Sequence, residues 1–260
     1  MKIQKGTIFA GLFVLGMAAG VSGLANAQAS EAKEKAPMYC YIGNWDIPRA
    51  QWADMAKADD ADRPILEKAL STGTIVGFGT DMTVIHTANG GTNDQWWCAT
   101  SRAGLMNVLE QFYQGGNSTT PVLASATKHW DELYVSTHYN WHAGSLKNGY
   151  THVGFYKLKA DAPDDAVEML SKTLVAPLLE KQLADGTIAE YEIDTQAIHT
   201  SSPDTFAIVY IAKDAEGLDK VQSAVESSLK SNPFAGPAFG SMTDQSGHRD
   251  ELLRTNATFK

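Results

Sequence analysis

The sequence predicts an α+β fold built from two tandem copies of one structural unit. A segment of 24 residues, 64–87, recurs 113 residues later at 177–200, with 12 of the 24 positions identical. Chance would give about one or two identities at ordinary residue frequencies. Strand-like and helix-like hydrophobic periods also follow each other in the same order in both copies. The chain is therefore expected to repeat one arrangement of strands and helices.

Each predicted element of the first copy has a local signal. The elements, in chain order, are a strand at 39–44, a helix at 48–71, strands at 74–85 and 95–100, a helix around 105–112 and a strand at 132–138. The first helix carries an apolar stripe and contains Pro64, which should kink it. The helix is expected to end at Gly73, because helices often end with a glycine in the left-handed backbone conformation. The two central strands flank an Asn-Gly-Gly run, which predicts a hairpin, and apolar residues at helical spacing mark the second helix.

The second copy repeats these signals with one difference in length. A proline and a glycine again lie within and after the first helix, at Pro177 and Gly186. The run His-Trp-Asp-Glu-Leu at 129–133 recurs as His-Arg-Asp-Glu-Leu at 248–252, where the offset has grown to 119 residues. We therefore expect six extra residues in the second copy, near 231–237.

The order strand, helix, strand, strand, helix, strand is that of the split βαβ, ferredoxin-like fold, present here twice. Such a tandem pair resembles the dimeric α/β-barrel superfamily with both halves in one chain, which includes antibiotic-biosynthesis monooxygenases and NIPSNAP-like proteins. The resemblance covers residues 38–260 and implies a single-chain α/β barrel with repeats at 38–148 and 149–260. It is carried by element order and duplication. No catalytic motif of a single family is matched, so no functional residue is carried over.

The N-terminus has the order of a secretory signal peptide. Lysines at positions 2 and 5 precede an apolar stretch, and small residues follow up to Ala27. We expect residues 1–27 to be removed on export and residues 28–37 to form a flexible leader. The mature protein would then act in the periplasm or outside the cell, with no membrane anchor. The formal net charge of −9 makes nucleic acid an unfavourable partner. The oligomeric state is left open.

The chain has two cysteines, Cys40 and Cys98. In the repeat register they correspond to Val153 and Ile211, so both are expected at buried apolar positions. An oxidising compartment would permit them to pair. A single disulfide and two buried free thiols both fit the sequence.

The alternation of residues along the strands predicts a ligand pocket. Neighbouring residues in a strand point to opposite faces, and a helix-covered face should be aliphatic. We take as helix-covered the face of Cys40, Ile42, Val76, Phe78, Leu133 and Val135. The opposite face combines aromatic and polar groups, as small-molecule sites do. The predicted ligand-binding residues are Tyr39, Tyr41, Gly77, Gly79, Trp97, Tyr134, His138, His152, Tyr156, Glu190, Glu192 and Tyr210.

Two interpretations of this face stay open. Gly77 and Gly79 align with Glu190 and Glu192. The first copy therefore has no side chains at these two positions, whereas the second has two carboxyl groups. This difference suggests a ligand lying over the glycines of the first copy. Alternatively, both faces form an interface between the repeats, in which tyrosines donate hydrogen bonds to the two glutamates.

No residue is marked as catalytic. The weak candidates are His138, His152, Glu190 and Glu192, as acid or base or, for the histidines, as axial ligand to haem. These four groups could also hold a divalent metal, but strand positions do not ensure that they converge. We therefore expect no metal and no tightly held cofactor. The histidines that recur in both copies, His86, His199, His129 and His248, are interpreted as structural.

The leading hypothesis is an exported protein that binds a small aromatic or apolar ligand inside a single-chain barrel. A monooxygenase-like or haem-handling enzyme is the alternative that the resemblance implies. A third possibility is a structural protein whose barrel is filled by its own side chains. Truncation of Trp97 is expected to distinguish the third, because removing a buried ring from a filled interior costs several kcal/mol.

Overall fold

A computed structural model describes residues 35–87 and 90–260 of the chain. The predicted signal peptide, and the predicted leader up to residue 34, lie outside the described residues. The strands are β1 (Met38–Asp46), β2 (Gly77–Thr83), β3 (Asn93–Ala99), β4 (Lys128–Trp141), β5 (Gly144–Leu158), β6 (Ile188–Ile198), β7 (Thr205–Ala212) and β8 (Thr243–Phe259). The predicted start of the second repeat, residue 149, lies inside β5.

The strands close into one antiparallel barrel, in the order β1-β3-β2-β8-β5-β7-β6-β4. Within it, each repeat contributes four adjacent strands in the ferredoxin-like order, β4-β1-β3-β2 and β8-β5-β7-β6. The two sets join edge to edge twice, through the ladders between β2 and β8 and between β4 and β6. Closure leaves no unpaired strand edge. The predicted fold class, two tandem ferredoxin-like repeats packed as a single-chain barrel, is confirmed.

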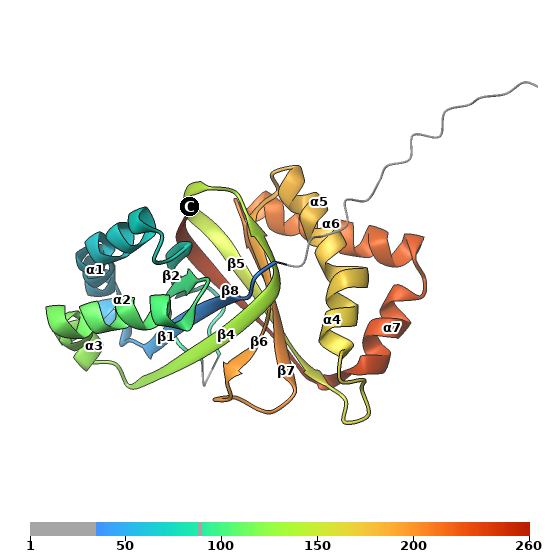
Figure 1. Cartoon of the computed structure of the whole chain (residues 1–260), viewed down its shortest axis with the longest axis horizontal. Helices are drawn as coiled ribbons and strands as arrows, with labels where there is room; N and C mark the ends of the chain where they lie inside the picture. Colours follow the sequence, from blue (N-terminus) through green and yellow to red (C-terminus); the bar gives the residue numbers. More distant parts are fainter. Residues whose placement is uncertain (1–34, 88–89) are drawn as a thin grey trace, which may run out of the picture. The chain divides into compact units, whose positions relative to one another are not determined.

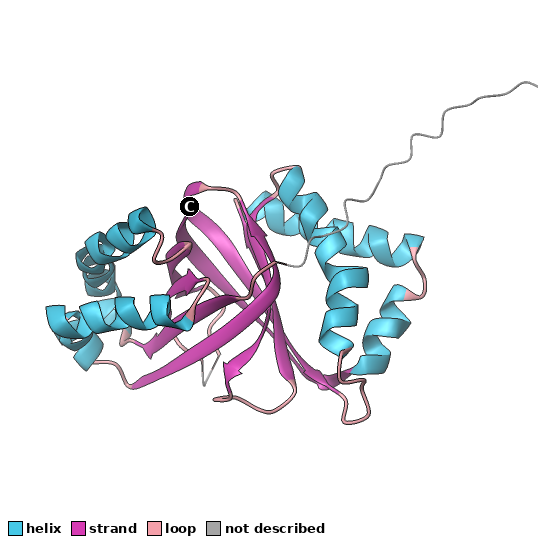
Figure 2. Ribbon diagram, in the orientation of Figure 1, coloured by secondary structure: helices cyan, strands magenta, loops and turns pink. Residues whose placement is uncertain are grey.

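Helices cover the outside of the barrel in two groups (Figures 1 and 2). The first repeat supplies α1 (Trp52–Thr72), α2 (Arg102–Gly115) and α3 (Pro121–Ala124). The second supplies α4 (Ala166–Leu170), α5 (Ala176–Ala184), α6 (Ala215–Ser231) and α7 (Ala235–Met242). In the described ranges, no helix is both long and apolar enough to cross a membrane.

The glycine signals act as predicted after the first helix of each repeat, and two further helices begin at side-chain caps. Gly73 and Gly186 follow helices with φ of 76° and 79°, the left-handed conformation that glycine adopts at least cost. Ser101 and Asp214 begin α2 and α6, each accepting a hydrogen bond from a backbone N–H three residues later.

The two prolines have different consequences. Pro64 lies inside a continuous α1. Pro177, its counterpart, lies in the first turn of α5, directly after a π-helical turn at Ser171–Val175. Proline has no backbone N–H to donate, and the first turn of an α-helix is where that donor has no intrahelical partner. The wider π-helical turn ends α4, so that α5 begins with Pro177 in its first turn. The helix of the second repeat is thereby divided.

The extra length of the second repeat lies around α7, which has 8 residues where α3 of the first repeat has 4. The insertion was expected near 231–237, and α7 begins at Ala235. Phe239 and Met242 of α7 pack against the apolar cluster beneath α4–α6. The added segment therefore fills space on the outer face of the second half-barrel.

Candidate functional site

The barrel interior is lined by one residue of every two along the strands. It encloses a cavity of about 70 Å³. The lining includes apolar and aromatic groups from several strands, such as Ile42, Trp96, Val153 and Phe259, together with seven carboxyl groups: Asp81, Asp94, Glu132, Glu190, Glu192, Asp194 and Glu251. Gly77, Gly79, Tyr134, Glu190 and Glu192 of the predicted pocket lie on this inner face.

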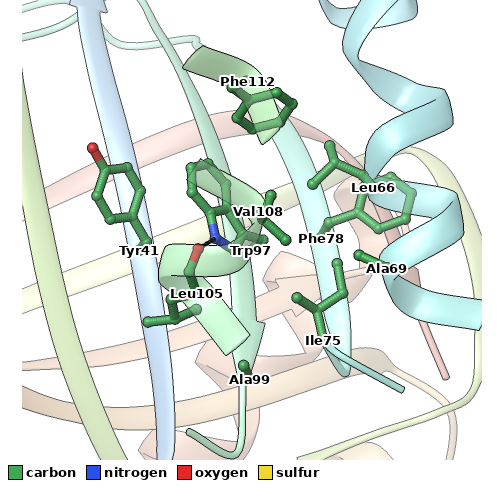
Figure 3. Close-up of a cluster of buried hydrophobic side chains, with 10 residues drawn as sticks. All are labelled: Tyr41, Leu66, Ala69, Ile75, Phe78, Trp97, Ala99, Leu105, Val108 and Phe112. Atoms are coloured by element: carbon green, nitrogen blue, oxygen red, sulfur yellow. Dashed lines mark hydrogen bonds between the residues drawn. The ribbon is translucent and has the colours of Figure 1, made fainter. Parts of the chain in front are cut away.

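The predicted face was wrong for β1 and β3. Tyr41 and Trp97 point outward into the cluster under α1 and α2, with Tyr39 packed against it, whereas Cys40 and Ile42 point inward. Figure 3 shows Tyr41 and Trp97 on the same side as the helix residues of this cluster. The strands are covered on both faces, by helices outside and by other strands inside, so an apolar side chain does not identify either face.

The same error affects the second repeat. Tyr156 packs against Phe206 and Phe239 outside the barrel. His152 stacks on Tyr210, also on the outer face, with ring centroids 5.0 Å apart.

His138 lies outside because a register shift between Ser136 and His138 inverts the alternation of β4. Its Nε2 lies 2.7 Å from Glu168 of α4. The predicted convergence of His138 and His152 with Glu190 and Glu192 is therefore wrong, since the barrel wall separates the imidazoles from the carboxyl groups.

The glycines of β2 make room for rings of the chain itself. A Cβ at Gly77 would lie 2.5 Å from Phe259, and one at Gly79 would lie 2.4 Å from Trp96. The interpretation of a ligand lying over these glycines is thus corrected: Trp96 and Phe259 take that space. Trp96 also donates a hydrogen bond of 3.0 Å from Nε1 to Asp81.

The two cysteines form a disulfide inside the barrel, between directly paired residues of β1 and β3. Both are buried, as their repeat counterparts Val153 and Ile211 suggested. Glu192 Oε2 lies 3.2 Å from Cys40 Sγ. The predicted alternative of free thiols does not describe this structure.

Burial raises the pKa of most interior carboxyl groups. It raises the pKa of Glu192 to about 7 and that of Asp81 to about 6, although Asp81 accepts hydrogen bonds. Burial, followed by repulsion from neighbouring carboxylates, raises the pKa of Asp94, Glu190 and Asp194 well above the ordinary range. The tyrosine bonds to Glu190 and Glu192 expected of an inter-repeat interface are not formed: Tyr134 donates to Glu132.

A larger cavity lies outside the barrel, between the sheet of the first repeat and α1–α3. Its volume is about 260 Å³. Tyr41 and Trp97 form part of the sheet side, stacked with centroids 4.5 Å apart, and Leu109 and Phe112 of α2 form part of the helix side. We call this cavity the outer pocket. Its complete lining is Tyr41, Trp45, Asp62, Gln95, Trp97, Leu109, Phe112, Tyr113, Asn117, Thr119, Leu123, Ala124, His129 and Asp131.

A buried carboxylate lies in the wall of the outer pocket. Asp62 of α1 is 7% exposed and accepts hydrogen bonds from Gln95 Nε2 at 3.4 Å and Asn117 Nδ2 at 2.5 Å. Burial raises the pKa of Asp62, and the two amide donors oppose this rise. The group is thus a fixed acceptor in the wall of a pocket that also contains several aromatic rings.

A second polar group borders the pocket at β4. His129 Nδ1 lies 2.9 Å from the carbonyl of Asn44, and its Nε2 lies 3.4 Å from Asp131. The imidazole also stacks on Trp45. Burial and the nearby Asp131 carboxylate raise the pKa of the Tyr41 hydroxyl, which therefore stays protonated as a hydrogen-bond donor.

The second repeat has apolar residues where the pocket has polar ones. In the 113-residue register, Asp62 and Gln95 correspond to Val175 and Ile208. Both pack against the apolar cluster of the second half, to which Phe239 adds a ring. The outer pocket is therefore a feature in which the two copies have diverged.

Sequence reasoning missed Asp62, Gln95 and Asn117. The signal was available in the repeat alignment, where a charged residue of one copy faces valine in the other within a predicted helix. Asn117 had no such signal, since it follows α2 in a segment that only the tertiary structure brings over Asp62.

Comparisons with known proteins support the fold. No protein-family model matches the chain. No curated protein matches it either. Among solved structures, a candidate monooxygenase from Fusobacterium nucleatum matches with a TM-score of 0.63 and 9% identity, over 86% of this chain and 95% of the other.

Two further structures are similar. A candidate monooxygenase from Lactobacillus acidophilus matches with a TM-score of 0.59 and 9% identity, over 86% of this chain and 97% of the other. An anthrone oxidase-like protein matches with a TM-score of 0.51 and 8% identity, over 87% and 95%. At these identities the likeness concerns the fold alone. The chain has the fold of the dimeric α/β barrels, with both halves in one polypeptide.

Proposed function

We propose that the protein binds a small aromatic molecule in the outer pocket of its first repeat. The observation that carries this proposal is the buried Asp62 carboxylate, held by two amide donors in the wall of a cavity of about 260 Å³. The sequence predicted a ligand inside the barrel, and we now propose that the ligand lies outside it, in the space beneath α1–α3.

The pocket walls favour one chemical class. Tyr41, Trp97 and Phe112 offer ring faces and edges against which an aromatic ring packs in stacked or edge-to-face geometry. Asp62 accepts hydrogen bonds and cannot donate when ionised. The volume is slightly below the range typical for drug-sized ligands. A single-ring phenol or aromatic amine fits these properties, because it combines a ring with an O–H or N–H donor.

The test compares the native protein with a variant that copies the second repeat. Single-ring phenols and anilines would be titrated while tryptophan fluorescence and the thermal midpoint are followed. The double variant Asp62→Val, Gln95→Ile should fold, since valine and isoleucine occupy the same positions in the second copy. We expect it to bind the best compound of the panel at least tenfold more weakly.

Glu190→Gln, inside the barrel, serves as the control and should bind the aromatic compound like the native protein. The proposal fails if no compound of the panel alters fluorescence or the midpoint. It also fails if the double variant binds as tightly as the native protein.

An enzyme acting in the same pocket is the second candidate. His129 and Asp131 border the pocket beside Tyr41 and supply a basic group within reach of a bound phenol. Oxygen consumption in the presence of the bound compound would distinguish an oxygenase from a binding protein. The haem alternative, with His138 or His152 as ligand, stays a prediction that a haem titration followed at the Soret band checks.

We also propose that the protein works outside the cytoplasm. The signal-like order of residues 1–27 and the Cys40–Cys98 disulfide support this location. Cell fractionation tests it, and recovery of the uncleaved chain in the cytoplasm alone would contradict it.

A further inference from the structure

The barrel interior concentrates carboxyl groups on the face of the sheet opposite to the outer pocket. Seven of the residues that line its cavity are acidic, and none of these lining residues is basic. Arg249 pairs with Glu251, a lining residue, but does not itself line the cavity. Buried carboxylates are stable as ions only when a positive group or several donors compensate them. The chain itself supplies such compensation for few of them.

Asp194 shows that the cavity lacks a hydrogen-bonding partner. This residue is 2% exposed, lines the cavity, and has an Oδ1 atom without a hydrogen-bond partner among the described residues. Glu192 is a neighbouring carboxyl group of the lining, and after burial its charge is the next cause that raises the pKa of Asp194. A buried acceptor left without a donor is unfavourable. A bound molecule with N–H groups would satisfy it.

The spacing of the carboxyl groups favours an organic cation over a metal ion. Within the described part of the chain, one set of three candidate metal-binding atoms lies within 4.8 Å of one another, and it consists of Cys40, Cys98 and Glu192. The two cysteines of that set are bonded to each other. The remaining carboxyl groups are spread around the wall, which suits a cation that carries several N–H donors along its length.

The apolar part of the lining fits the same ligand class. Trp96, Tyr134, Phe155 and Phe259 place rings beside the carboxyl groups. Aromatic faces attract ammonium groups and pack against alkyl chains. A volume of about 70 Å³ is roughly five times that needed by one water molecule. The interior therefore accommodates a short alkylamine and excludes a large ligand.

A neighbouring cavity is also lined by carboxyl groups. A smaller cavity of about 50 Å³ shares Asp94, Glu132 and Glu251 with the interior, and Arg249 also lines it. Carboxyl groups gathered in neighbouring cavities attract cations from solution.

We propose that the barrel interior is a binding site for a small alkylammonium cation, such as a short diamine. The cation donates N–H bonds to Asp194 and Glu190 while its alkyl chain lies against Trp96 and Phe259. This site is separate from the outer pocket and does not depend on the function proposed for it.

Calorimetric titration with 1,4-diaminobutane at pH 8, where the amines are protonated, tests the proposal on the full mature chain. We expect one diamine per chain, with 1,4-butanediol as a neutral analogue that does not bind. Asp194→Asn and Glu190→Gln should each weaken diamine binding at least tenfold. The outer-pocket variant Asp62→Val, Gln95→Ile should bind the diamine like the native protein.

Folding and binding are read separately in this test. Asp194→Asn removes a buried carboxylate without changing its shape, so we expect an equal or higher thermal midpoint at pH 8 together with weaker diamine binding. If Asp194→Asn does not fold, the diamine affinity of Glu190→Gln tests the proposal instead. Calcium binding in place of diamine binding would overturn the proposal, and so would the absence of both, which would mean that the carboxyl groups only share protons among themselves.

Discussion

At the residue scale, the sequence gives the chemical type of each side chain but not the face of the sheet on which it lies. Tyr41 and Trp97 were expected to border a ligand, and both line the outer pocket, but from the opposite face of the sheet. Asp62 contributes a buried carboxyl group, and its alignment with Val175 of the second copy was a signal that the sequence already contained. The predicted ligand-binding role of these residues stays a prediction.

Trp97 is expected to contribute strongly to the stability of the fold. It is 2% exposed, stacks on Tyr41, contacts Phe112 edge-on and donates a hydrogen bond to the carbonyl of Leu105. Trp97→Ala should lower the free energy of unfolding by about 3–5 kcal/mol, measured by denaturant titration. Leu229→Ala, at a position 44% exposed, is the surface control and should have little effect.

This result would not decide what fills the barrel. Trp97 belongs to the cluster beneath α1 and α2, so its loss destabilises the protein whether the interior is empty or occupied. A midpoint equal to that of the native protein would show that Trp97 is not part of the core.

At the element scale, local signals set where helices end, and local irregularities set where side chains point. The glycine caps were predicted from sequence because left-handed backbone strongly favours glycine. The register shift in β4 had no such signal, and it moved His138 to the outer face. The π-helical turn before α5 likewise arises from packing around a proline whose counterpart lies inside an unbroken helix.

The two glycine caps are expected to contribute equally to stability. Gly73 and Gly186 have nearly the same φ, and an added Cβ at either position would meet the flexible end of a lysine. Gly73→Ala and Gly186→Ala should therefore each cost about 1–2 kcal/mol, mainly from the left-handed backbone. Urea denaturation measures both.

Gly240→Ala in α7 is the matched control. An added Cβ there meets nothing within 4 Å. Alanine is a better helix former than glycine by about 1 kcal/mol, so this variant should be as stable as the native protein or more stable. A loss in Gly240→Ala as large as in Gly73→Ala would contradict the assignment of the cost to φ.

At the scale of the whole molecule, barrel closure brings acidic groups from both repeats into one interior. Asp81 and Asp94 come from the first repeat, and Glu190, Glu192 and Asp194 from the second. Their burial couples the stability of the fold to pH, because burial disfavours the charged form of each.

The free energy of unfolding is expected to fall as pH rises from about 4 to about 7. The interior carboxyl groups hold protons more tightly in the folded than in the unfolded chain, so raising the pH through this interval favours unfolding. The pKa of Asp59 in α1, raised by burial to about 7, acts in the same direction. His152, whose pKa is lowered by burial, acts in the opposite direction, but it is a single group.

Thermal midpoints at pH 5 and pH 8 measure this effect, and the midpoint should be higher at pH 5. Glu190→Gln should reduce the difference between the two values, because glutamine does not titrate. A midpoint that rises from pH 5 to pH 8 would mean that the interior carboxyl groups are compensated by positive charge.

The sequence by itself determined the duplication, the order of elements and the helix ends, and these sufficed for the fold. Each follows from local physics: hydrophobic period, proline and glycine geometry, and the similarity of two segments 113 residues apart. Only the tertiary structure decided which strand face points inward, because helices outside and strands inside bury apolar groups equally. It also decided the outer pocket, since Asn117 and Gln95 meet Asp62 only once α1, α2 and β3 are packed together.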